Sequence, residues 1–128
     1  MDELKNMTDQ ELALRIQAYR NRLRALMSEV SDYMQHGAGS KDEILYKYKS
    51  LKEDVKADAH YVDLLINHKG KAKYYRDFTG ALSEAAAFGF TAPTNSSINQ
   101  KLFNSIEEAH YKLGKCYPDK ILEDGSAQ

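Results

Sequence analysis

Hydrophobic residues recur at alternating steps of four and three along the first part of the chain. The repeated positions are Leu12, Ile16, Tyr19, Leu23, Leu26, Val30 and Tyr33. This spacing places the side chains on one face of an α-helix and is typical of the heptad seam of a coiled coil. A capping box of Thr8 and Glu11 predicts where the helix begins, and Gly37 suits the left-handed position that ends it. The pattern therefore predicts a helix over about residues 8–36.

The same spacing returns after a short glycine-containing turn. Ser40 and Glu43 form a second capping box, which predicts a second helix start. The seam positions that follow are Ile44, Tyr48, Leu51 and Val55. A strict continuation places Asp58 in the seam, whereas a shift by one position to Ala59 restores an apolar face, and we interpret this shift as a stutter. This second helix is predicted to cover about residues 41–69.

Two shorter helices are predicted in the second half of the chain, over about residues 71–88 and 97–114. Their core candidates recur at helical spacing and are Tyr74, Phe78, Leu82 and Ala85, then Leu102, Ile106, Ala109 and Leu113. Ser97 and Gln100 form a third capping box at the start of the last helix. Proline cannot continue a helix, so residues 118–128 are expected to fray as a tail.

The charges favour antiparallel pairing of the first two helices. In a parallel homodimer of the first helix, Arg15 and Arg20 would face each other as like charges. Folding back on the second helix instead brings Arg22 opposite the neighbourhood of Asp54, and the short connection favours the same hairpin. We therefore predict a single all-α domain over residues 1–128, with a long antiparallel hairpin packed against two shorter helices like a four-helix bundle.

Composition narrows the class of protein. A net charge of −1 gives no overall attraction to nucleic acid or membrane. The single cysteine, Cys116, cannot form an internal disulfide and suits a reducing compartment. The polar N-terminus shows no signal peptide, and the apolar runs are too short to span a bilayer. These features predict a cytoplasmic protein without membrane contact.

Two phenylalanines flank a glycine where the third predicted helix ends. One interpretation is a Schellman motif, with Gly89 in the left-handed position and both rings in the core. The other is that Phe88 or Phe90 stays partly exposed and anchors a partner protein, because aromatic residues are enriched at interfaces. On the second interpretation, the predicted partner-binding residues are Phe88, Phe90, Tyr74 and Tyr75.

The sequence contains side chains of the types that bind metals, but not the complete set of ligands that a known metal site requires. Glu107 and His110 form one Glu-x-x-His pair, whereas a ferritin-like dimetal site needs two such pairs and two further glutamates. A helical-bundle metal protein is therefore a remote alternative. A second group of acids and histidines is expected to make hydrogen bonds: Asp58, His60, Asp63 and His68. Without a nucleophile motif or a phosphate loop, we predict no enzyme and no cofactor.

A basic stretch offers a different function. Lys69, Lys71, Lys73 and Arg76 occur together without an acid, and Tyr74 and Tyr75 lie among them. Such clusters bind backbone phosphates, and tyrosines stack on bases, so a nucleic-acid-binding protein is the alternative hypothesis. The near-neutral charge and the lack of a helix-turn-helix signature argue against it.

The main functional hypothesis is a small, non-catalytic interaction or regulatory protein. The two long helices exceed the length that two shorter helices can cover, so apolar surface is expected to remain. Candidates for uncovered residues are Tyr33, Met34 and Ile44 near the hairpin tip, and Leu12 and Ile66 near its base. Such a surface predicts a homodimer or a complex with another protein.

Overall fold

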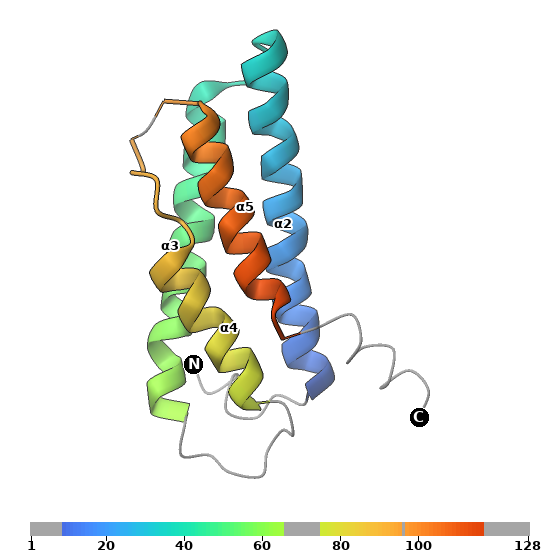
Figure 1. Cartoon of the computed structure of the whole chain (residues 1–128), viewed down its shortest axis with the longest axis vertical. Helices are drawn as coiled ribbons and strands as arrows, with labels where there is room; N and C mark the ends of the chain where they lie inside the picture. The colour runs from blue at the N-terminus through green and yellow to red at the C-terminus, as the bar shows by residue number, and fades with distance from the viewer. Residues whose placement is uncertain (1–8, 66–74, 96, 117–128) are drawn as a thin grey trace.

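A computed structural model describes residues 9–65, 75–95 and 97–116 (Figure 1). Within these ranges all the regular elements are α-helices, namely α2 (Asp9–His36), α3 (Lys41–Leu65), α4 (Tyr75–Phe88) and α5 (Gln100–Gly114). The predicted all-α class and the order of four helices are confirmed. Thr8, Gly70 and the tail 118–128 lie outside the described residues.

The four helices run alternately up and down around one core (Figure 1). Each helix packs mainly on two neighbours, in the cyclic order α2–α3–α4–α5. The long hairpin of α2 and α3 therefore forms one side of the bundle, and α4 and α5 form the opposite side. Of the helices in the described ranges, none combines the length and apolar character that crossing a lipid bilayer requires.

The predicted seam of α2 is the centre of the core. Its six buried members are Leu12, Ile16, Tyr19, Leu23, Leu26 and Val30, and Tyr33 is partly buried. On α3 the strict four-three pattern continues to Asp58, which is only 2% exposed, whereas Ala59 is partly buried. The interpretation of a stutter is therefore wrong at this turn. The seam accepts a carboxylate because Arg15 and Tyr19 on α2 bind it.

The connection between α2 and α3 forms as predicted. Gly37 adopts a φ of 64°, and its backbone N–H donates to the carbonyl of Tyr33 at 2.9 Å. The Oγ of Ser40 then accepts from the backbone N–H of Glu43 at 3.3 Å. A glycine at the left-handed position and a serine at the N-cap thus join the two antiparallel helices over a short distance.

The end of α4 differs from the predicted Schellman motif. The left-handed residue is Phe90, with a φ of 52°, and not Gly89. The N–H of Gly89 still donates to the carbonyl of Ala85 at 3.0 Å, as in a helix. A Cβ atom on Gly89 would lie 2.6 Å from the Cα of Ala109 on α5. Glycine is therefore needed here for the close approach of α5, and not for the turn.

The segment 89–99, of which every residue but 96 is described, runs from α4 toward the end of the bundle where α2 joins α3 (Figure 1). Phe90 and Ala92 of this segment are buried, and Ile98 packs against the core. This irregular segment covers core that helix lengths alone leave open. The predicted uncovered surface is wrong for Ile44 near the hairpin tip and for Leu12 near its base, because both are buried.

The remaining residues that were predicted to be uncovered differ from one another. Tyr33 is partly buried against the core, Met34 is exposed, and Ile66 lies outside the described residues.

A buried polar network holds the segment 89–99 in place. The Tyr48 hydroxyl on α3 donates to the carbonyl of Ala92 at 3.0 Å, and the N–H of Ala92 donates to the Oγ of Ser105 on α5 at 3.1 Å. The Ser105 hydroxyl lies 2.9 Å from that of Tyr48. Since the single Tyr48 proton goes to Ala92, the Ser105 hydroxyl is the donor in this contact. Every polar group of the network therefore has a partner, as burial requires.

The start of α5 differs from the predicted capping box. The N-cap is Asn99, whose Oδ1 accepts from the backbone N–H of Leu102 at 3.1 Å. Ser97 lies before the helix, so the predicted cap at this residue is wrong. Asn and Ser satisfy the free N–H groups equally well, so local sequence did not discriminate between them.

Candidate functional site

The structure separates the two phenylalanines that were predicted to contact a partner. Phe90 is 2% exposed, and its ring centroid lies 5.8 Å from that of Tyr48. Phe88 is 62% exposed although it lies only two residues earlier. Phe90 is thus a core residue, and Phe88 alone of the pair is accessible to a partner.

The other predicted contact residues cannot be placed in the same way. Tyr74, Lys69, Lys71 and Lys73 lie outside the described residues. Tyr75 and Arg76 belong to the first turn of α4, but their side chains are not among those described. The nucleic-acid hypothesis for this stretch stays a prediction.

A second exposed aromatic ring accompanies Phe88 on the same side of the bundle. Tyr111 on α5 is 61% exposed. It lies between Ala109 and Leu113, both of which are buried, and so points away from the core. We define the α4–α5 face by its outward side chains, Glu84, Phe88, Glu107, Glu108, Tyr111, Lys112 and Lys115. The sequence analysis missed Tyr111, although its position opposite the apolar stripe of α5 was a usable signal.

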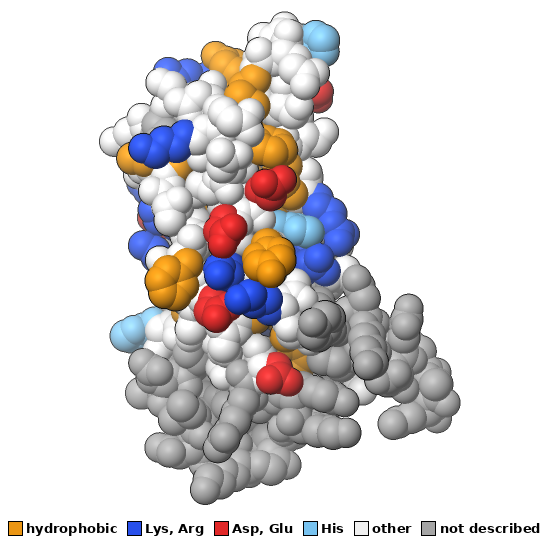
Figure 2. Space-filling view, viewed as in Figure 1, with side chains coloured by type: hydrophobic (Ala, Val, Ile, Leu, Met, Phe, Trp, Pro, Cys, Tyr) orange, Lys and Arg blue, Asp and Glu red, His pale blue; other side chains and the backbone are white. Residues whose placement is uncertain are grey.

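Lysine side chains connect the two rings. The Nζ of Lys112 lies 5.7 Å from the ring centroid of Phe88 and 6.0 Å from that of Tyr111. The Nζ of Lys115 lies 5.7 Å from the Tyr111 centroid. A cation over an aromatic ring is attracted by the ring quadrupole. Figure 2 shows exposed hydrophobic side chains with basic and acidic groups between them over α4 and α5.

Each of these lysines pairs with a glutamate. Lys115 pairs with Glu84 on α4 at 3.1 Å, and Lys112 pairs with Glu108 at 3.6 Å. The hydrogen bond from Lys115 to Glu84 raises the pKa of the lysine. Both glutamates are well exposed, so these pairs balance the charge of the face and contribute little to stability.

A hollow of about 440 Å³ adjoins Tyr111 between α5 and α2. It is lined by Arg20, Glu107, His110, Tyr111, Gly114 and Lys115. At its edge the Nε of Arg24 donates to the Nε2 of His110 at 3.1 Å, so this nitrogen carries no proton. Burial, followed by the positive charges of Arg20 and Arg24, lowers the pKa of His110. The lining of the hollow therefore combines two cations, Arg20 and Lys115, with one acid, Glu107, beside an exposed ring.

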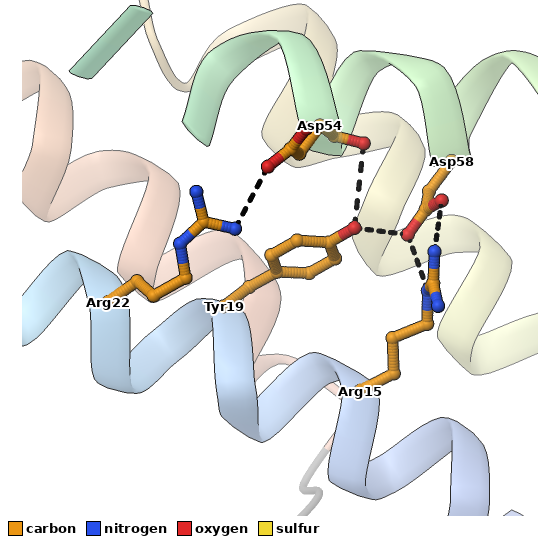
Figure 3. Close-up of polar contacts among 5 residues, drawn as sticks. All are labelled: Arg15, Tyr19, Arg22, Asp54 and Asp58. Carbon is orange, nitrogen blue, oxygen red and sulfur yellow. Dashed lines mark hydrogen bonds and ion pairs between the residues drawn. The ribbon is translucent and has the colours of Figure 1, made fainter. Parts of the chain in front are cut away.

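The opposite side of the bundle carries a polar cluster between α2 and α3 (Figure 3). Arg15 binds Asp58 through two bonds, Nε to Oδ2 at 2.6 Å and Nη2 to Oδ1 at 2.7 Å. The hydroxyl of Tyr19 donates to the same carboxylate. Arg22 pairs with Asp54 at 3.0 Å, which confirms the predicted proximity of these two residues.

The donors and acceptors of this cluster bind one another. Burial, and then the hydrogen bond to Asp58, raise the pKa of Tyr19, so the phenol keeps its proton and acts as a donor. The buried carboxylate of Asp58 is matched by a bidentate guanidinium and a hydroxyl, which is the arrangement that makes a buried charge tolerable. Its groups serve to join α2 to α3, so we assign the cluster a structural role.

In the described part of the chain, side chains that could bind a metal ion or act as a nucleophile are not brought together. Among the described residues, no three His, Cys, Asp or Glu side chains converge to hold a metal ion. Cys116 is buried, and burial raises its pKa to about 11, so at neutral pH it is a thiol and a poor nucleophile. Asp63 has no described side chain, and His68 lies outside the described ranges.

No family model, curated protein or solved structure matches the chain. The α4–α5 face, with its two accessible rings, is the candidate functional site.

Proposed function

We propose that this protein is a non-catalytic protein-binding module that acts through the α4–α5 face. The observation that carries the proposal is the pair of exposed rings, Phe88 and Tyr111, which both lie within 6.0 Å of the Nζ of Lys112. Aromatic residues are enriched at protein interfaces and among the residues that dominate binding energy. Two adjacent rings left in water on a small domain therefore favour a binding surface.

The rings are presented by a rigid scaffold. The helices beneath them pack closely, since Gly89 at the end of α4 lies directly against Ala109 of α5. Ala81 and Ala85 of α4 are also buried in this region. A fixed spacing of the rings means that little conformational freedom is lost when a partner binds.

The charge of the face favours a polypeptide partner over a nucleic acid. The two lysines, Lys112 and Lys115, are each paired with a glutamate. The face therefore carries no excess of positive charge, whereas binding to a phosphate backbone depends on such an excess. Mixed charges around aromatic rings match the polar rim and apolar centre of a protein–protein interface.

Site-specific photocrosslinking in the native host tests this function. The photoreactive residue benzoylphenylalanine replaces Phe88 or Tyr111, and a matched control carries it at Tyr46, which is 72% exposed on α3. We expect covalent protein adducts from positions 88 and 111 and none from position 46. Equal adducts from all three positions, or adducts from position 46 alone, would contradict the assignment of the binding face.

We also place this function in the cytoplasm, where thiols stay reduced. The support is compositional and structural: the chain has one cysteine, and that cysteine is buried as a free thiol.

A further inference from the structure

The exposed side of α5 carries its charges in a particular order. Glu107, Tyr111 and Lys115 follow one another at steps of four, so they lie in one row along the helix. All three are exposed. The acid lies on one side of the tyrosine and the base on the other, each about 6 Å away along the axis at 1.5 Å per residue. When a second, identical row runs in the opposite direction beside the first, each acid therefore lies opposite a base.

We propose that a second copy of this chain docks on the α4–α5 face, with the two α5 helices antiparallel about a two-fold axis at Tyr111. The proposal rests on the proposed function and names the partner. In this arrangement Glu107 lies opposite Lys115 of the second copy, and Lys115 lies opposite its Glu107. A two-fold interface repeats each contact, so one complementary pair supplies two.

The alternative parallel arrangement is unfavourable. It would bring Glu107 toward Glu107 and Lys115 toward Lys115 of the second copy, and like charges at an interface select against that pairing. The existing pair of Lys115 with Glu84 does not compete strongly, because both side chains are 41% exposed and exposed pairs contribute little. Lys115 can therefore contact both acids at once.

The small size of the face predicts a weak dimer. Interfaces that rest on one short helix and a few neighbouring side chains fall at the low end of the size range, where association is transient. We expect micromolar dissociation constants and a strong dependence on salt, because the specific contacts are exposed ion pairs.

A charge-exchange experiment tests the arrangement. Glu107→Lys places lysine against Lys115 in a homodimer, and Lys115→Glu places glutamate against Glu107. Each variant alone is expected to sediment as a monomer at concentrations where the unaltered chain forms a dimer. An equimolar mixture of the two variants is expected to restore the dimer, since both contacts again join opposite charges. Circular dichroism melting curves establish that each variant is folded.

A matched control separates specific pairing from general charge effects. Glu53→Lys introduces the same charge change on the exposed side of α3. It is expected to leave the dimer of its own chain intact and, when it is mixed with fluorescently labelled Lys115→Glu, to leave the labelled chain monomeric. If the Glu53→Lys mixture restores association as well as the Glu107→Lys mixture does, the proposed antiparallel pairing is wrong.

A second measurement reports the two-fold axis directly. Tyr111→Cys brings two thiols face to face at the axis, so mild oxidation should give a disulfide-linked dimer, while Tyr46→Cys should not. A chain that remains monomeric throughout, or cross-links equally from position 46, overturns the second copy as the partner. Photocrosslinks from positions 88 and 111 to other proteins would then still support the proposed function, whereas their loss as well would overturn both.

Discussion

The two sides of this bundle join their helices by different means. On one side, long charged side chains bridge α2 and α3, as Arg15 does to Asp58 and Arg22 to Asp54. On the other side, Gly89 lets the end of α4 approach α5 directly. Ion pairs of long side chains connect α2 and α3, whereas α4 and α5 combine close backbone contact at Gly89 with the ion pair of Glu84 and Lys115.

This difference bears on the binding face that we propose. The bridging groups of α2 and α3 bind one another, and the buried carboxylate of Asp58 is surrounded by its own donors. Where α4 and α5 approach closely, Phe88 and Tyr111 lie outside the contact and stay exposed.

The largest expected effect breaks the charged bridge. Arg15→Met leaves the carboxylate of Asp58 buried without its cation, and we expect a loss of about 3 kcal/mol in the free energy of unfolding, as for other broken buried pairs. Urea denaturation measures the loss. Removing both charges with Arg15→Met and Asp58→Leu should recover most of it, because replacing a whole buried pair with apolar groups is often neutral.

The control for this bridge is the exposed pair beside it. Arg22→Ala removes the partner of Asp54, which is half exposed, and should cost less than about 1 kcal/mol. Equal costs for Arg15→Met and Arg22→Ala would show that burial of Asp58 does not matter to stability.

The next effect breaks the close contact on the other side. Gly89→Ala places a Cβ atom 2.6 Å from the Cα of Ala109, and overpacking of this kind costs about 1–3 kcal/mol. Thermal unfolding measures it. Gly80→Ala is the matched control, because its Cβ would meet nothing within 4 Å and α4 should gain about 0.5–1 kcal/mol. A stabilising Gly89→Ala would mean that α4 and α5 are not in close contact.

An effect of similar size is expected inside the bundle, at the network that holds the segment 89–99. Ser105→Ala leaves the N–H of Ala92 buried without its acceptor, which costs about 1–3 kcal/mol. Hydrogen exchange of the Ala92 amide should accelerate in this variant. Asn104→Ala, at the neighbouring exposed position, should leave that exchange unchanged. Equal acceleration by both variants would contradict the hydrogen bond between Ala92 and Ser105.

The pH dependence of the free energy of unfolding reports on the buried hydroxyl of Tyr19 in the bridge between α2 and α3. Because the pKa of Tyr19 is raised above its ordinary value of 10.0, the unfolded chain loses this proton first as the pH rises. The free energy of unfolding is therefore expected to fall above pH 10, by up to about 1.4 kcal/mol per pH unit from this residue. Tyr19→Phe should make the fall shallower. Unfolding curves from pH 7 to 11 measure the slopes, and equal slopes would contradict the burial of this hydroxyl.

The smallest stability effect is expected at the two exposed rings of the proposed binding face. Phe88→Ala and Tyr111→Ala remove exposed rings, and surface substitutions usually change stability by no more than about 0.5 kcal/mol. The same variants should weaken the dimer measured by sedimentation. A large loss of stability with unchanged association would reverse the assignment and make the rings structural.

Periodicity in the sequence was sufficient for the architecture. The residues of the α2 seam, from Leu12 to Val30, are buried as predicted, and the turn forms at Gly37 and Ser40. These features follow from local geometry, because 3.6 residues per turn place evenly spaced side chains on one face. Charge pattern also predicted that α2 and α3 pair with Arg22 near Asp54.

Tertiary structure alone decided the features that depend on contacts between distant residues. Asp58 is buried in the seam because Arg15 and Tyr19 bind it from another helix. Gly89 is a contact glycine because Ala109 lies against it. Phe88 and Phe90 have nearly the same local sequence, yet one is exposed and the other buried. Spacing along the chain determines which residues share a face, but only the neighbouring elements determine whether that face is covered.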